Sequence, residues 1–105
     1  MPQYAVIATH PPDNCPLTNK SVRKFYKKNW PQLPKLAQKM GVTIMTAVHL
    51  DPNHKAFILF EAPNAESVRD LLVQTGMMHF LEIDFHLVTP LQALFDNMDD
   101  MPTIF

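Results

Sequence analysis

The sequence predicts a single α+β domain, residues 1–105, in which helices cover one face of a four-stranded antiparallel sheet. Two observations favour this class. Four short β-rich runs alternate with helical stretches in the order β-α-β-β-α-β, and one more helix follows near the C-terminus. The chain has 105 residues, 47% of them hydrophobic, which suits one domain with a modest core. Because so small a domain buries a low share of its surface, we expect a second copy to cover more of it in a homodimer.

A strand and a proline-rich loop begin the chain. Residues 4–10 (YAVIATH) are rich in the β-branched and aromatic side chains that strands prefer. Pro11 and Pro12 follow at once, and because proline lacks the N–H that a sheet requires, the strand should end there. Residues 11–18 form a loop that contains Cys15, the only cysteine. A single cysteine excludes an internal disulfide and any paired-cysteine motif.

The next stretch is helical but interrupted. From residue 19 to residue 40, apolar side chains recur every three or four positions, which is the period of a helix. Pro31 and Pro34 lie inside this stretch, and each removes an N–H and crowds the preceding turn. We therefore expect a kink or a break into two helices near Trp30. Gly41 follows where a helix commonly ends on a residue with positive φ.

Two β-rich runs, residues 42–50 (VTIMTAVHL) and 56–61 (AFILFE), come next. The five residues between them (DPNHK) include Asp, Pro and Asn, which are typical of tight turns. The short connection predicts that the two runs form an antiparallel hairpin.

A second helix and a fourth strand follow the hairpin. Asn64 is suited to cap a helix over residues 65–75, and Gly76 is suited to end it. Residues 81–88 (LEIDFHLV) alternate apolar and polar side chains, which is typical of a half-buried strand. Thr89 as a cap and Pro90 at the first position predict a last helix over residues 91–98.

This element order is that of the ferredoxin-like, or split βαβ, fold. In element order, residues 4–88 resemble the dimeric α/β-barrel superfamily, in which two such sheets pack face to face. The resemblance implies an antiparallel sheet and a dimer. Members of that superfamily include small monooxygenases, isomerases, haem-dependent enzymes and ligand-binding modules, so the fold leaves the activity open.

Chain reversal in this topology brings polar residues together at one edge of the sheet. The first two strands run one way and the last two run the other, so the end of one pair meets the start of the other. The side chains expected at this edge come from strand ends and from the loops that join them. They are His10, Cys15, His49, His54, His79 and Glu82.

Imidazole, thiolate and carboxylate groups are the ligands that zinc, copper, iron and nickel prefer in proteins. We therefore predict a transition-metal site or a small-molecule pocket at this edge. The first candidate ligands are His10, His49 and His79, with Cys15 and Glu82 as alternates. No HExxH motif is present, so the prediction depends on the topology.

The faces of the strands predict where a pocket would lie. If Ile44 and Val48 face the helices, Met45 and His49 face the other side, together with Phe57 and Leu59. The first strand is equally apolar on both faces, so the face of its last histidine stays open. We expect a pocket on the face opposite the helices, covered by the second copy and walled by residues that share that face or its rim. These residues are Met45, Phe57, Leu59 and His54.

Two other functions are compatible with the same residues. A histidine beside an apolar pocket can act as a general base in a cofactor-free oxygenase or isomerase. Cys15 is either an inert small hydrophobic residue or a thiolate activated by the following helix. The chain can also be a regulatory or assembly module without chemistry.

Charge is divided between the two halves of the chain. Residues 1–55 carry eight Lys or Arg and two Asp, whereas residues 56–105 carry one Arg and eight acidic residues. Five of the cations fall within residues 20–28, as on a solvated helix face, and no aromatic platform accompanies them, so nucleic-acid binding is not expected. The apolar runs are too short to cross a membrane, and no signal-peptide pattern begins the chain. We expect a cytoplasmic protein without a membrane partner.

Overall fold

The computed structural model describes all residues, Met1–Phe105. Four strands and four helices form in the order that the sequence predicts, with short 3₁₀ turns at Pro12–Asn14 and Met98–Asp100. The elements are β1 (Gln3–Thr9), α1 (Lys20–Asn29), α2 (Gln32–Lys39), β2 (Thr43–Leu50), β3 (Lys55–Glu61), α3 (Ala65–Gln74), β4 (Glu82–Val88) and α4 (Leu91–Asn97).

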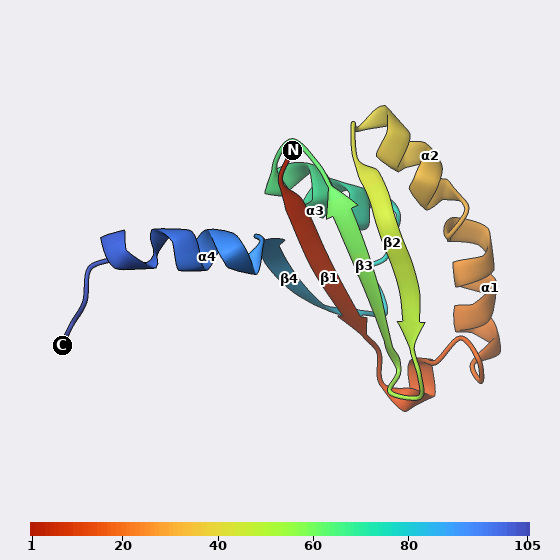
Figure 1. The fold of residues 1–105 in the computed structure, drawn as a ribbon. Coiled ribbons are helices and arrows are strands. Elements are labelled where there is room, and N and C mark those ends of the chain that lie inside the picture. Colours follow the sequence, from red (N-terminus) through yellow and green to blue (C-terminus); the bar gives the residue numbers. More distant parts are fainter.

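The four strands form one antiparallel sheet in the order β2-β3-β1-β4. Helices α1, α2 and α3 lie on one face of this sheet and leave the other face open (Figure 1). This arrangement confirms the predicted α+β class and is compatible with a ferredoxin-like fold. No helix has the length and apolar character needed to cross a membrane.

The core lies between the sheet and the helices. The sheet contributes Val6, Ile58 and Phe60, which are fully buried, and α2 and α3 contribute Leu33 and Leu71. Along β1, every second residue is buried, as expected for a strand with one covered face. The alternation places Tyr4, Val6 and Ala8 under the helices.

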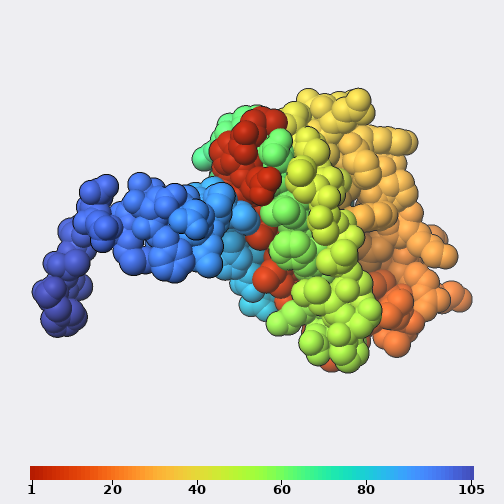
Figure 2. Space-filling model, viewed as in Figure 1, coloured from red at the N-terminus to blue at the C-terminus, as the bar shows by residue number.

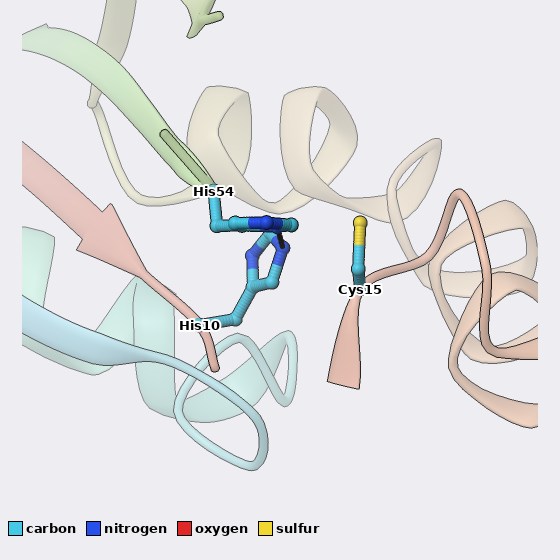
Figure 3. A group of neighbouring side chains, drawn as sticks. All are labelled: His10, Cys15 and His54. Atoms are coloured by element: carbon cyan, nitrogen blue, oxygen red, sulfur yellow. Dashed lines mark hydrogen bonds between the residues drawn. The ribbon is translucent and has the colours of Figure 1, made fainter. Parts of the chain in front are cut away.

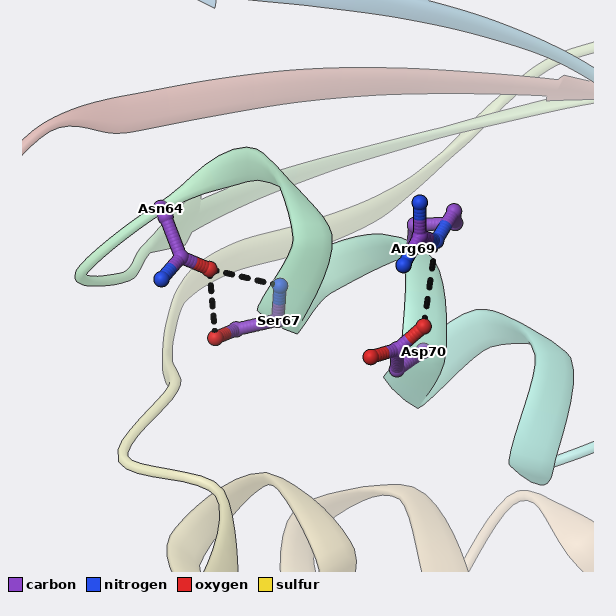
Figure 4. Close-up of polar contacts among 4 residues, drawn as sticks. All are labelled: Asn64, Ser67, Arg69 and Asp70. Carbon is purple, nitrogen blue, oxygen red and sulfur yellow. Dashed lines mark hydrogen bonds and ion pairs between the residues drawn. The ribbon is translucent and has the colours of Figure 1, made fainter.

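Local signals set the helix ends. α1 and α2 separate at Trp30 and Pro31, which confirms the predicted break. Gly41 and Gly76 have φ of +71° and +75°, so both helix ends use the left-handed conformation that glycine favours. At the start of α3, Asn64 Oδ1 accepts a hydrogen bond from the backbone N–H of Ser67 (2.9 Å), as Figure 4 shows.

The predicted cap of α4 is wrong. The N-cap position of this helix is Pro90 rather than Thr89, and no side chain caps it. α4 and the residues after it extend away from the sheet (Figures 1 and 2). The molecule is therefore elongated, 53 × 32 × 19 Å. Apolar side chains of this arm are exposed, among them Leu91, Phe95 and Phe105.

A β-bulge in β2 reverses the predicted faces of its second half. Ile44 pairs with Phe60 and Thr46 pairs with Leu59, so Met45 is an extra residue without a partner. Beyond the bulge, Val48 lies opposite Phe57, on the open face. The predictions that Val48 faces the helices and that His49 faces away are therefore wrong, because His49 lies opposite Ala56 on the helix-covered face.

Candidate metal centre and adjacent cavity

Two histidines meet where β1 and the β2–β3 hairpin end. The backbone N–H of His10 donates to the carbonyl oxygen of His54 (3.1 Å), which extends the β1–β3 ladder one step beyond the pair Thr9 and Lys55. His10 continues the buried alternation of β1 and exposes only 8% of its surface. Its ring therefore lies on the helix-covered face of the sheet, which settles the face that the sequence left open.

The two imidazole rings are in direct contact. Nδ1 of His54 and Nε2 of His10 lie 3.3 Å apart, at hydrogen-bond distance. The ring centroids are 5.2 Å apart and the planes cross at 78° (Figure 3). Two nitrogens that point at the same space can share a proton or a metal ion.

His54 has an uncommon backbone conformation. Its φ is +57°, and it is the one residue other than glycine with positive φ in the chain. This left-handed conformation costs an L-residue about 1 kcal/mol or more, and glycine usually occupies it. Such strain is found most often at functional sites, where the side chain has a role that glycine cannot supply.

Cys15 reaches the same place from the loop that follows β1. Its side chain is buried, and its backbone carbonyl accepts hydrogen bonds from the N–H groups of Thr18 (3.1 Å) and Asn19 (2.7 Å). One donor atom from each of His10, Cys15 and His54 lies within 4.8 Å of the other two. Figure 3 shows the cysteine sulfur beside the histidine pair.

The N-cap residue of α1 and one residue of its first turn hold the loop around Cys15. Asn19 caps the helix, because its Oδ1 accepts from the N–H of Val22 (3.1 Å), and its Nδ2 donates to the carbonyl of Asp13 (2.9 Å). Arg23 donates to the carbonyls of Pro16 (2.9 Å) and Leu17 (2.6 Å). Asn19 precedes a helical period, which is a recognisable cap signal, but its second contact across the loop has no sequence signal.

The surroundings favour neutral imidazole at His10. Burial lowers the pKa of His10 below its usual 6.5, and the nearby His54 and His49 lower this pKa further. A neutral ring can accept a proton or bind a metal, whereas an imidazolium cannot.

The other predicted ligands lie outside the group of three. Nδ1 of His49 contacts a carboxylate oxygen of Asp51, and the His49 side chain is 45% exposed. Nδ1 of His79 hydrogen-bonds to the carbonyl of Gly76 (2.9 Å) and its ring packs against Phe25. Glu82 is exposed and pairs with Thr9, so it lies on the open face of the sheet.

A cavity of about 320 Å³ lies beside the group, between α1 and the sheet. Eleven of its fifteen lining residues are hydrophobic, and both His10 and Cys15 belong to its wall. The sheet residues here include Ala8, Ala47 and Ala56, whereas the sheet residues farther along are large. The cavity exists because these short side chains do not fill the space under α1.

The residues predicted to wall a pocket lie elsewhere, apart from His54 in the donor group. Phe57 and Leu59 are on the open face, opposite Ile7 and Ala5, and Met45 is exposed at the bulge. The cavity is on the helix-covered face, and its wall includes Tyr26 and Trp30 from the end of α1. The sequence did not identify these aromatic residues as pocket residues because their helical spacing equally suits the core.

Tyr26 carries an unpaired polar atom. Its hydroxyl is buried and is the one buried side-chain N or O atom without a hydrogen-bond partner. Burial raises the pKa of Tyr26 to about 12. The hydroxyl therefore keeps its proton near neutral pH and can still donate it to a hydrogen bond.

No family model matches this chain, and no curated protein is similar to it in sequence. The function is therefore inferred from the geometry of the site.

Proposed function

We propose that the protein binds one transition-metal ion through His10, His54 and Cys15, and that the fourth position of the metal faces the adjacent cavity. The observation that carries this proposal is the convergence of three donor atoms within 4.8 Å from three separate segments of the chain. Three protein ligands and one open position are the arrangement of catalytic zinc sites.

The distances favour the proposal. In a tetrahedral zinc site, bond lengths of about 2.0–2.3 Å place two nitrogens about 3.3 Å apart and a nitrogen and a sulfur about 3.6 Å apart. The two histidine nitrogens lie 3.3 Å apart already. The cysteine sulfur, within 4.8 Å of both, needs a movement of roughly 1 Å to complete the site.

The donor set narrows the metal. Two imidazoles and one thiolate suit zinc, and a His₂Cys set also suits copper, whereas iron and nickel sites more often include carboxylates or additional ligands. No carboxylate belongs to the group of three donors. Among the predicted metals, we therefore propose zinc or copper.

Titration of the metal-free protein with zinc and with copper tests this proposal. We expect binding of one ion per chain, and we expect Cys15→Ser and His54→Gly to weaken it at least 100-fold, more than the 10–100-fold effects typical of residues behind the ligands. The control is His86→Gln, because His86 is an exposed histidine on β4. Equal metal affinity of Cys15→Ser and the wild type would disprove the site.

A general-base function is the second candidate. The hydrogen bond between His10 and His54 at the cavity wall favours it, because one ring can orient the other toward a substrate. This function needs both histidines but no thiolate. If the protein binds no metal, and if Cys15→Ser leaves the binding of small molecules in the cavity unchanged, the second candidate is supported over the first.

We also propose that the open face of the sheet joins a second copy. Apolar side chains that include Ile7, Phe57 and Leu59 lie on this face, and Val48 exposes 47% of its surface. A charge at the centre of the face, Leu59→Glu, should convert a dimer to a monomer in analytical ultracentrifugation. A wild-type monomer would refute this assembly. The buried free thiol is compatible with the cytoplasm, a reducing compartment, as the proposed location.

A further inference from the structure

We infer that the cavity beside His10 and Cys15 binds a small, mainly apolar molecule that carries one hydrogen-bonding group. Its volume of about 320 Å³ is at the lower end of the range for small-molecule sites, roughly 300–1,000 Å³. Such sites combine an apolar wall with a few polar groups that orient the ligand. This cavity has that composition.

The residues that make the cavity are alanines on three different strands. Ala8 on β1 pairs with Ala56 on β3, and Ala47 on β2 pairs with a residue two positions further along β3; all three alanines line the cavity on the helix-covered face. Farther along the same face of β1 and β3, beyond the cavity, the residues are Val6 and Phe60, which are fully buried. The cavity is open to solvent on one side, because its wall residues Trp30 and Leu17 are exposed. A ligand that fills it removes the apolar wall from water, which favours binding.

The Tyr26 hydroxyl is the partner that we propose for a polar group on the ligand. A buried hydroxyl without a partner is unfavourable, and Tyr26, a wall residue of the cavity, carries such a hydroxyl. The hydroxyl has almost no accessible surface, so a ligand in the cavity reaches it only if the Tyr26 side chain shifts; a hydroxyl or carbonyl group on the ligand would then satisfy it. Phenol-like and alcohol-like molecules have this chemistry, whereas a multiply charged molecule would leave its charges unpaired against an apolar wall.

Binding of the apolar part does not require a metal, so the inference goes beyond the proposed function. A molecule in this cavity would also lie against His10 and Cys15, which belong to its wall. That it would approach the open position of a bound metal is the one part that rests on the proposed function.

Trp30 provides a direct measurement of occupancy. It is the only tryptophan, it belongs to the cavity wall, and its indole N–H gives a single signal in a nitrogen–proton correlation spectrum. We would titrate the metal-free protein with phenol and with toluene, which have nearly the same size and differ by a hydroxyl in place of a methyl group. Both are expected to shift the Trp30 signal in a saturable way.

Two variants separate the apolar and polar contributions. Ala56→Leu should fill the cavity and abolish both titrations, and Ala47→Leu is the second filling variant if the first unfolds. Tyr26→Phe should weaken phenol relative to toluene by about 2–12-fold, the value of one hydrogen bond of about 0.5–1.5 kcal/mol. Circular dichroism of each variant is the control for folding.

The failures of the two proposals are distinguishable. If zinc and copper do not bind but the probes shift Trp30, the metal site is refuted and the cavity site stands. If a metal binds but neither probe shifts the Trp30 signal, the cavity inference is overturned. Equal effects of Tyr26→Phe on phenol and toluene would overturn the role of the hydroxyl.

Discussion

Replacing His54 by glycine separates its metal-binding role from its structural role. At φ of +57°, glycine keeps the hairpin conformation and relieves about 1 kcal/mol or more of strain. Two costs oppose this gain: about 0.5–1 kcal/mol for the greater freedom of an unfolded glycine, and about 0.5–1.5 kcal/mol for the hydrogen bond to His10. The terms nearly cancel, so without metal the free energy of unfolding of the variant should lie within about 1 kcal/mol of that of the wild type.

The metal-bound proteins should differ strongly. At a zinc concentration 100 times its Kd, the wild type gains about 2.7 kcal/mol of folding free energy from binding. For a domain of this size, that gain raises the Tm by about 10–15 °C. A variant with 100-fold weaker affinity gains only about 0.4 kcal/mol under the same conditions, or about 2 °C.

Thermal unfolding of both proteins, with and without zinc, measures these differences. His54→Ala is the matched companion, because it also removes the ring but keeps a Cβ at positive φ, so it should be less stable than His54→Gly. A zinc-induced rise in Tm of His54→Gly equal to that of the wild type would falsify the assignment of His54 as a ligand. A loss of more than about 3 kcal/mol without metal would show that the ring is structural.

Three further predictions concern the loop, the cavity and the helix ends. Asn19→Ala and Asn64→Ala each remove a helix cap and should each lower the free energy of unfolding by about 1 kcal/mol in denaturant unfolding. Only Asn19→Ala should also weaken metal binding, because Asn19 also holds the loop that contains the proposed ligand Cys15. Equal metal affinities of the two variants in a metal titration would contradict this. The pKa of Tyr26 is raised to about 12, above the unfolded value of about 10, so the folded state holds this proton more tightly. The free energy of unfolding should therefore fall as the pH rises from about 10 to about 12. Tyr26→Phe should remove this fall, and it should also remove the phenolate absorbance that appears only at the higher pH. Gly76→Ala should cost more than Gly41→Ala in thermal melts, since both have positive φ but a Cβ at Gly76 would lie 2.8 Å from a Phe25 ring carbon, whereas none lies within 4 Å at Gly41; equal costs would show that the ring moves aside freely.

Local sequence signals were sufficient to predict the order of the elements. Pro31 and Pro34 marked the break between α1 and α2, and Gly41 and Gly76 marked helix ends, because each of these residues has a conformational preference that acts within a few positions. The Asn64 cap was predicted for the same reason. Thr89 is not the cap of α4, because the N-cap preference of one residue did not decide where this short, exposed helix begins.

The faces of β2 depended on a feature without a local signal. Residues 42–50 carry apolar side chains on both faces, so the pattern does not reveal where an extra residue enters. The bulge falls at Met45, with no glycine or proline beside it. A shift of one residue moves every later side chain to the other face, and this is why Val48 and His49 exchanged sides.

Part of the site was within reach of the sequence, because topology brings strand ends together. His10 and Cys15 were expected at one edge, and the structure places them together there. His54 was expected in the pocket wall rather than among the ligands. In the structure it has a left-handed conformation and its ring contacts that of His10, and the sequence did not predict this conformation at residue 54. His79 was expected among the ligands, but its Nδ1 hydrogen-bonds to the carbonyl of Gly76, three residues earlier in the chain.

The bulge also separates the two proposed surfaces of the molecule. Without it, His49 would lie on the open face, and a site built from it would require the second copy of the chain. With it, His49 lies on the helix-covered face, as His10 does, and the three donor atoms, from His10, Cys15 and His54, all belong to one chain. The open face carries none of these donors, so a dimer through that face and a metal in each copy are independent. A monomeric variant that still binds one metal per chain is consistent with this arrangement, whereas metal binding that requires the dimer contradicts it.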